Sequence, residues 1–173
     1  MRRVRYSVAM SLDGYIATED GGYDWIVEDP TIDMEARFKS VDAALVGRRT
    51  YDIMKRGPKV ELPGVDVYIA SRTLRPEDEP GVTVVADAEA TLLSLRDRPG
   101  GEIWIMGGGE LFRGLLGAGL VDEVECAVIP ILLGGGIPLL PPPSKSTRLE
   151  LTESHVYPSG IVMLTYAVSR SSN

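Results

Sequence analysis

The chain has 173 residues, of which 44% are hydrophobic and 25% charged, a balance typical of a globular protein with one sizeable core. The 18 Lys and Arg residues are outnumbered by 25 Asp and Glu residues, and the net charge of −7 argues against non-specific nucleic-acid binding. The sequence lacks the apolar run of roughly 18–20 residues that a membrane helix needs. Its basic start is not followed by the apolar segment of a secretory signal. We therefore expect a cytoplasmic protein that binds neither nucleic acid nor a membrane.

The only cysteine, Cys126, and the only histidine, His155, limit the chemistry of the chain. An intrachain disulfide is impossible, and a zinc site built from Cys and His is nearly excluded, so we expect no metal. Cys126 lies in the apolar stretch Val124–Ile129 and is expected to be a buried small hydrophobe. His155 lies in the alternating stretch Leu149–Tyr157 and is expected to be structural rather than catalytic.

The first half of the chain predicts two strands and two helices around a glycine-punctuated loop. Thr31 is the expected cap of the first helix, because Met34, Phe38 and Val41 follow it at helical spacing. The other elements are a strand over Val4–Met10, a loop over Ser11–Asp24, a strand over Ala43–Val46 and a helix over Arg49–Lys55.

The second half predicts further strands that alternate with helices. These are strands over Val65–Ala70, Val82–Val85, Glu102–Met106 and Val121–Ile129, with helices over Ala88–Leu95 and Glu110–Leu116. Two closing strands, over Arg148–Val156 and Ile161–Val168, flank the turn Pro158-Ser159-Gly160. This order predicts an α/β fold with a mainly parallel sheet covered on both faces and an antiparallel pair at one edge. We expect one domain over residues 1–170 and a frayed tail over residues 171–173.

The glycine triplet Gly107-Gly108-Gly109 is the strongest local signal, because a buried strand precedes it and a helix follows it. Without Cβ atoms, such a turn lets a phosphate approach the backbone closely. The helix that follows presents unpaired N–H groups and the positive end of its dipole to the anion. The alternative is a tight strand-to-helix turn that binds nothing.

Other turns after strands also suit a nucleotide. Gly47-Arg48-Arg49-Thr50 offers a helix N-terminus, a hydroxyl and two guanidinium groups. Ser71-Arg72-Thr73 suits a phosphate monoester such as a ribose 2′-phosphate, which would favour NADP over NAD. The loop Ser11–Ala17 suits a planar ligand, because Ala9 and Ile16 offer flat apolar contact. Ligands of open α/β sheets bind where such turns meet.

These segments, in this order and spacing, resemble the dihydrofolate reductase superfamily. The run Ser11-Leu12-Asp13-Gly14-Tyr15-Ile16-Ala17 is similar to the SLDGxxA motif of one branch, the reductase domain of the riboflavin-biosynthesis deaminase–reductase. Leu120-Val121-Asp122-Glu123, followed by Pro130 and Leu132-Leu133-Gly134, is similar to a second signature of that domain. The resemblance implies a dihydrofolate-reductase-like fold with three α/β/α layers.

The resemblance also implies NADPH as cofactor, a set of residues that bind it, and a homodimer. Ala9 and Ile16 would face the nicotinamide, and Ser71 and Arg72 would lie near the 2′-phosphate. The remaining phosphates would be held by Gly47, Arg48, Arg49, Thr50, Gly108, Gly109, Glu110 and Leu111.

The implied activity is NADPH-dependent hydride transfer to a small nitrogen heterocycle, most like 5-amino-6-(5-phosphoribosylamino)uracil reductase. Dihydrofolate, a pterin, is the alternative substrate. Met106 stands where that domain usually has a glutamate, and Ile53-Met54-Lys55 stands where acidic residues are expected. The single Cys and His exclude the zinc deaminase domain of the bifunctional enzyme. Two further alternatives are a non-catalytic NADPH-binding protein and an interaction module that binds no cofactor.

A carboxylate on the helix after the first loop supports proton transfer in dihydrofolate reductases, and Asp33 is the best match. Glu35 and Asp29 are close rivals for the same role. Apolar surroundings would raise the pKa of such a carboxyl and let it relay a proton near neutral pH. The alternative role for Asp33 is stabilisation of the helix N-terminus.

Overall fold

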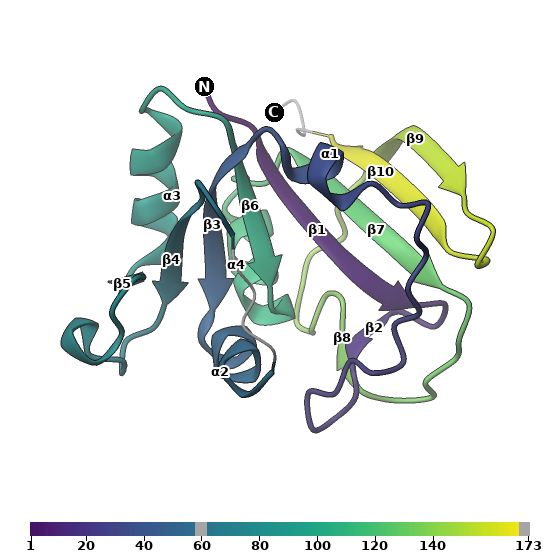
Figure 1. Cartoon of the computed structure of the whole chain (residues 1–173). Coiled ribbons are helices and arrows are strands. Elements are labelled where there is room, and N and C mark those ends of the chain that lie inside the picture. Colours follow the sequence, from purple (N-terminus) through teal and green to yellow (C-terminus); the bar gives the residue numbers. More distant parts are fainter. Residues whose placement is uncertain (58–61, 170–173) are drawn as a thin grey trace.

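The computed structural model describes residues 1–57 and 62–169 (Figure 1). The tail predicted at 171–173 lies outside these residues, and the domain boundary at residue 170 stays a prediction. The main sheet contains the strands β1 (Val4–Ser11), β3 (Val41–Gly47), β4 (Asp66–Ala70), β5 (Thr83–Val85), β6 (Glu102–Gly107), β7 (Glu123–Ile129), β9 (Leu149–Val156) and β10 (Val162–Val168).

The strands lie in the order β5-β4-β3-β6-β1-β7-β10-β9. All pairs from β5 to β7 are parallel, whereas β10 pairs antiparallel with both β7 and β9. The predicted mainly parallel sheet with an antiparallel C-terminal edge is therefore confirmed.

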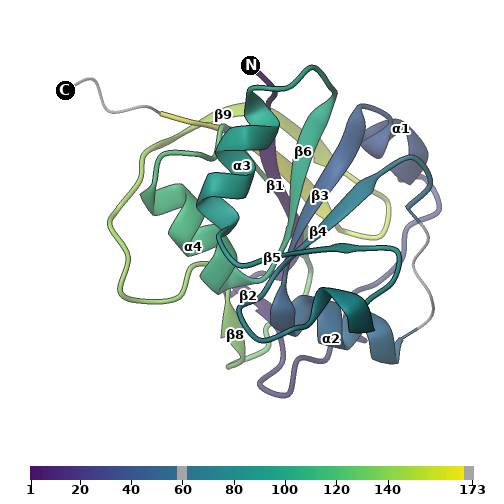
Figure 2. The same cartoon turned by 90° about the vertical axis from the view of Figure 1, so that its left-hand side faces the viewer.

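Helices cover both faces of this sheet (Figure 2). The helices α3 (Ala88–Arg96) and α4 (Gly109–Gly117) lie on one face, and α1 (Met34–Phe38) and α2 (Arg48–Arg56) lie on the other. A 3-10 turn, η1 (Pro76–Asp78), precedes β5. Within the described residues, none of the helices combines the length and hydropathy needed to cross a bilayer.

The main core lies between the sheet and the pair α3 and α4. Tyr6 from β1 stacks on Phe112 from α4, with ring centroids 3.9 Å apart. Cys126 is buried in the same core, as predicted. The other buried side chains of this core include Val4, Leu45, Leu92, Leu95, Ile103, Ile105, Leu115 and Val124.

Several local elements differ from the prediction. The first helix begins at Met34 rather than after Thr31, because the Asp33 carboxylate accepts a hydrogen bond from the Ala36 N–H at 2.9 Å and caps the helix. Thr31 instead donates its N–H to Asp29, at 2.9 Å. The helix ends early, so Val41, predicted to continue it, is the first residue of β3.

A small second sheet, formed by β2 (Tyr15–Ala17) and β8 (Ile137–Pro138), was absent from the prediction. It pairs the first loop with a segment more than a hundred residues further along the chain. The carboxylate of Asp13 holds the same two segments together, because it accepts N–H groups from Leu133 at 3.0 Å and Gly134 at 2.7 Å. The two motifs that carried the family resemblance therefore meet in space.

Candidate active site

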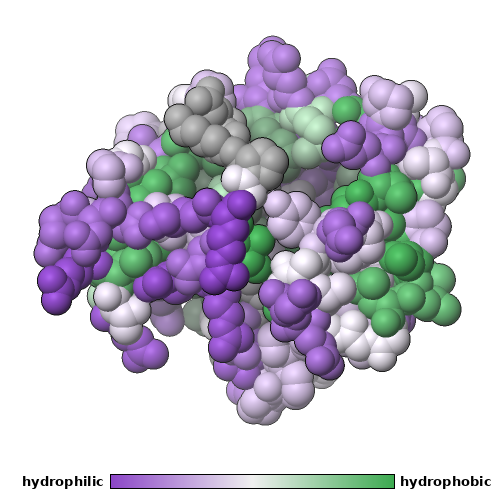
Figure 3. All heavy atoms as spheres, turned by 60° about the horizontal axis from the view of Figure 1, so that its bottom comes forward, coloured by the Kyte–Doolittle hydropathy of each residue, from purple (hydrophilic) through white to green (hydrophobic). Residues whose placement is uncertain are grey.

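A cavity of about 1070 Å³ opens at the carboxyl ends of β1, β3 and β6, and we call it the large cavity. The end of the molecule at which these strands finish is a mosaic of hydrophilic and hydrophobic surface (Figure 3). Ten of the twelve residues predicted to bind the cofactor line the large cavity: Ala9, Ile16, Gly47, Arg48, Arg49, Thr50, Gly108, Gly109, Glu110 and Leu111.

The glycine turns after the neighbouring strands β3 and β6 lie against each other in this cavity. A Cβ atom at Gly47 would lie 2.9 Å from the Gly107 carbonyl oxygen, closer than real Cβ contacts. Gly107 itself has a φ of +136°, a conformation that side chains with a Cβ rarely adopt. A Cβ at Gly109 would lie 2.7 Å from the carbonyl oxygen of Pro138. Glycine is therefore required here to bring three backbone segments together.

The helices α2 and α4 both begin at the large cavity, each over nine residues. Their N-cap residues, Gly47 and Gly108, provide no side chain to satisfy the first N–H groups. Two sets of N–H donors, each at the positive end of a helix dipole, are thus available to an anion. Arg48, Arg49 and Thr50 add two cations and a hydroxyl at the same place.

The last two predicted cofactor residues, Ser71 and Arg72, do not line the large cavity but lie beside it. The hydroxyl of Ser71 accepts the backbone N–H groups of Thr73 at 3.2 Å and Leu74 at 3.1 Å, which shapes the turn after β4. Arg48 reaches this turn by donating to the Thr73 hydroxyl at 3.2 Å, and its Nε also contacts Asp52 at 2.9 Å. Arg72 is exposed.

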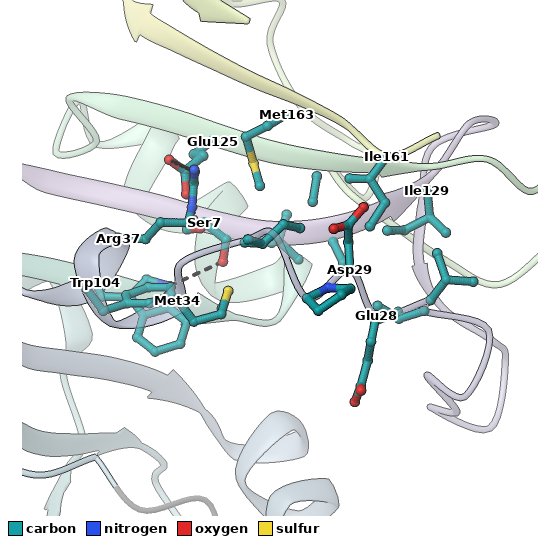
Figure 4. Close-up of a pocket in the computed structure, with 18 residues that line it drawn as sticks. Ser7, Glu28, Asp29, Met34, Arg37, Trp104, Glu125, Ile129, Ile161 and Met163 are labelled. Carbon is teal, nitrogen blue, oxygen red and sulfur yellow. Dashed lines mark hydrogen bonds and ion pairs between the residues drawn. The ribbon is translucent and has the colours of Figure 1, made fainter. Parts of the chain in front are cut away.

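A second cavity, of about 550 Å³, lies on the α1 side of the sheet, and we call it the side cavity. Its walls are formed by residues 26–30 with Ile32, Met34, Arg37 and Phe38, by residues of β1 and β7, and by Trp104, Ile161 and Met163. The two cavities share five wall residues, which are Ser7, Val8, Ala9, Ile26 and Trp104. The indole N–H of Trp104 donates to the Ser7 carbonyl oxygen at 3.2 Å, which fixes the ring between the two cavities (Figure 4).

One end of the side cavity carries a buried carboxylate, Glu125 from β7, beside Ser7 and Arg37 (Figure 4). Glu125 accepts a hydrogen bond from the Ser7 hydroxyl at 2.6 Å and pairs with Arg37 from α1, while an Arg5 nitrogen lies 3.8 Å away. Burial alone would raise the pKa of the Glu125 carboxyl, but the hydrogen bonds from Arg37 and Ser7 and the charge of Arg5 hold it below its usual range. The group is therefore an ionised acceptor at neutral pH.

The three carboxylates predicted as proton-transfer candidates occupy different places. Asp33 is exposed and caps α1, outside the residues that line either cavity, and Glu35 is exposed in the same helix turn. Asp29 lines the side cavity and is buried. Hydrogen bonds from the Thr31 side chain and from Ser159 hold the pKa of Asp29 well below its usual range, so it stays ionised near neutral pH.

Glu125 was missed as a site residue by the sequence prediction. It lies in a strand interpreted as apolar, with Val124 and Cys126 on either side. A glutamate inside an interior strand is rare unless it is paired or functional. The sequence could therefore have identified Glu125 as a candidate site residue from its position within an apolar strand.

The sequence of residues 2–163 matches the family model of the RibD C-terminal domain. The chain belongs to this family. The resemblance that was inferred from the SLDG and LVDE motifs is therefore confirmed.

Several known proteins are similar to this chain. YwjB, an uncharacterised protein of Bacillus subtilis, is 32% identical over 155 residues, which cover 87% of this chain and 89% of YwjB. A crystal structure of a candidate riboflavin biosynthesis protein from Shewanella sp. PV-4 is 28% identical with a TM-score of 0.82, covering 98% of this chain and 100% of that one. Dihydrofolate reductase from Enterococcus faecalis, complexed with NADP(H), is 20% identical with a TM-score of 0.71 and 97% coverage of both chains. The dihydrofolate-reductase-like fold is thereby confirmed.

Proposed function

We propose that this protein is an NADPH-dependent reductase that transfers hydride to a small nitrogen heterocycle. The observation that carries the proposal is the large cavity, which gathers ten residues from distant parts of the chain that were predicted to bind the cofactor. The side cavity shares five wall residues with it, so a substrate there would adjoin a bound nicotinamide. Membership of the RibD C-terminal domain family supports a reductase.

The residues of the large cavity fit a dinucleotide. Because Gly47 and Gly109 lack Cβ atoms, their turns pack directly on neighbouring backbone, and this packing brings the N-termini of α2 and α4 together at the cavity. The backbone N–H groups at these two helix starts would form a cradle for the phosphates. Arg48 and Arg49 would add charge to these N–H contacts. When bound, NADPH would supply the hydride from C4 of its nicotinamide. Ala9 and Ile16 would orient that ring against the shared wall.

Cofactor binding is the first test of the proposal. Purified protein is titrated with NADPH and NADH while the fluorescence of its two tryptophans, Trp25 and Trp104, is followed. Trp104 lines both cavities. We expect micromolar NADPH binding and much weaker NADH binding, because Ser71 and Arg72 would contact the 2′-phosphate. If neither nucleotide binds, the reductase proposal fails and the alternative of a module that binds no cofactor replaces it.

The preference for NADPH is tested at Arg72. Loss of one charge-assisted hydrogen bond corresponds to about tenfold or more in affinity, so Arg72→Ala should weaken NADPH binding by that factor and leave NADH binding unchanged. Arg75→Ala, an exposed arginine three residues further along the same turn, is the matched control. Equal effects of the two substitutions would contradict the role of Arg72.

The substrate is tested with 5-amino-6-(5-phosphoribosylamino)uracil, which the family resemblance ranks first, and with dihydrofolate. Turnover is measured as the disappearance of NADPH absorbance together with the reduced product. Reduction of dihydrofolate alone would reverse the ranking. Tight NADPH binding with no hydride transfer to any heterocycle would instead support the alternative of a non-catalytic NADPH-binding protein.

Asp33 stays the predicted proton-transfer residue. A suitable substitution can distinguish a role in proton transfer from the role of capping helix α1. Asparagine is as good a helix cap as aspartate, so Asp33→Asn preserves α1 while removing the titrating group. A chemical role predicts a loss of turnover and a changed pH–rate profile in this variant. An unchanged profile would leave Asp33 as a cap only, and the same measurement on Asp29→Asn and Glu35→Gln would then test its rivals.

We also propose a homodimer, as the family resemblance implies. Strand β9 is an edge strand whose side chains are all exposed, including Leu151 and Val156. An exposed apolar edge strand is a surface on which a second chain readily pairs. Sedimentation of the wild type and of Leu151→Lys tests this, since a dimer that pairs through β9 should dissociate in the variant.

A further inference from the structure

The side cavity has an excess of negative charge. Three carboxylates line it, from Glu28, Asp29 and Glu125, against the single guanidinium group of Arg37. That guanidinium already pairs with Glu125. Among the described residues that line this cavity, Arg37 is the only cation, so none of them offers an unpaired positive charge to an incoming anion.

The two buried carboxylates are fixed in place. Asp29 accepts the Ser159 N–H on one oxygen, at 2.9 Å, and the Thr31 N–H on the other. Glu125 receives the Ser7 hydroxyl on Oε1 and the guanidinium of Arg37 on Oε2. Neither carboxylate can swing away to make room for an anion without losing these partners.

Glu125 nevertheless retains capacity to accept hydrogen bonds. An ionised carboxylate offers about four lone-pair sites on its two oxygens, and Oε1 uses one of its sites for Ser7. The floor and walls around it are apolar or aromatic, with Trp104, Phe38 and Met163 among them. A flat ring with an N–H or amino group on its inner edge fits this arrangement, whereas an acceptor or an anion does not.

We propose that the side cavity selects a phosphate-free planar heterocycle and that Glu125 is the residue that recognises it, by accepting a hydrogen bond from a ring N–H or amino group. Arg37 is a positioning residue, because its guanidinium group holds the carboxylate of Glu125 in place and is therefore not free to bind an anion. This inference rests on the proposed function, since it narrows the substrate class of the same reductase.

The first experiment compares two ligands that differ only in a phosphate group. These are 5-amino-6-(5-phosphoribosylamino)uracil and the same compound after removal of its phosphate. We expect kcat/KM with NADPH to be about fivefold higher for the phosphate-free form, the upper end of the effect of one ionic contact near the surface. A higher value for the phosphorylated form would overturn the inference.

Direct binding separates this inference from the proposed function. If NADPH binds but neither compound is reduced, the affinities of the two compounds for the NADPH complex are measured by calorimetry. Tighter binding of the phosphate-free form supports the selection even though the activity fails. Tighter binding of the phosphorylated form, or binding of neither, overturns the selection.

The role of Glu125 is tested by Glu125→Gln, which keeps the shape of the side chain and an acceptor for Ser7. We expect about a tenfold or greater loss of affinity for the phosphate-free ligand, since a hydrogen bond to a charged acceptor is lost, while NADPH affinity stays unchanged. Glu153→Gln, an exposed glutamate of the edge strand β9, is the control and should bind like the wild type. Wild-type ligand affinity in Glu125→Gln would overturn the role of Glu125.

A second variant is expected to gain affinity rather than lose it, so the inference can still be tested if Glu125→Gln fails to fold. Glu28 lines the side cavity and is itself exposed, so Glu28→Lys adds a cation at low structural risk. This variant should bind the phosphorylated ligand several-fold more tightly than the wild type does. Unchanged or weaker binding of that ligand would contradict charge as the basis of the selection.

Discussion

The two faces of the central sheet carry different side chains, although every strand contributes alternate residues to both. On the face covered by α3 and α4, β1 presents Val4 and Tyr6, which are fully buried in an apolar core. On the face covered by α1 and α2, the same strand presents Arg5 and Ser7, which join a network of charged groups around Glu125.

The difference follows from how the helices cover each face. The helices α3 and α4, of nine residues each, close their face with packed side chains. On the other face α1 has five residues, none of them buried, and two cavities remain beside it and α2. Period-two alternation thus allows one strand to contribute to the packed core on one side and to line the candidate site on the other.

The largest expected difference between the faces concerns the thiol of Cys126. This residue lies on the face covered by α3 and α4, which we call the closed face. Burial raises its pKa to about 12, so the reactive thiolate is on the order of a thousandfold scarcer at neutral pH than in an unfolded chain. Alkylation of the native protein should be slower than in denaturant by at least that factor. Rapid alkylation of the folded protein would show that the closed face opens readily.

The two phenylalanines of the chain, Phe112 and Phe38, test the comparison directly, because they lie on opposite faces. Phe112→Ala should lower the free energy of unfolding by about 3–5 kcal/mol, the usual cost of removing a buried aromatic ring. Phe38 is only partly buried, so Phe38→Ala should cost less stability and instead weaken ligand binding in the side cavity. Urea unfolding measures the first quantity, and equal costs would contradict the division between the faces.

The glycine turns of the large cavity predict a third difference. Gly47→Ala should weaken NADPH binding by about tenfold or more, because the new Cβ would displace the turn at Gly107 by clashing with its carbonyl oxygen. Gly114 in α4 has open space at its Cβ position, so Gly114→Ala should leave NADPH binding unchanged and stabilise the protein by about 0.5–1 kcal/mol. Normal NADPH affinity in Gly47→Ala would argue against the cradle.

Asp13, in the loop between β1 and β2, predicts a smaller and pH-dependent effect. The hydrogen bond from the Ser11 hydroxyl, with those from the N–H groups of Leu133 and Gly134, lowers its pKa to about 2. Because the folded pKa lies below the unfolded value near 4, the ionised group stabilises the fold above about pH 4 and loses this effect as pH falls toward 2. The melting temperatures of the wild type and Asp13→Asn should therefore differ at neutral pH and converge in acid. A constant difference would contradict this assignment.

The sequence predicted those parts of the fold and site that depend on local patterns. Strand alternation identified β1 and β10, and the residues of the glycine turns at Gly47 and Gly107 proved to line one cavity. Neighbouring parallel strands bring their carboxyl ends together. The residues of the turns after these strands were therefore enough to predict which residues line that cavity.

The rest depends on contacts between distant segments. Strands β2 and β8 are too short to show a period, and they exist because they pair with each other. Both Thr31 and Asp33 could cap the start of α1. Asp33 is the cap in the structure, and Thr31 hydrogen-bonds to Asp29 instead. The polar end of the side cavity needs Arg37 and Glu125 to meet, although they lie far apart in the chain.

The wall shared by the two cavities, with Trp104 at its centre, has a consequence for energetics. A ligand bound in one cavity would change the surface that a ligand in the other cavity meets, so the two proposed binding equilibria would be linked. Linkage is reciprocal, so the proposed cofactor NADPH would alter the affinity for the proposed heterocycle by the same factor by which the heterocycle would alter the affinity for NADPH. The order in which the two ligands arrive then changes the path to the ternary complex but not its free energy.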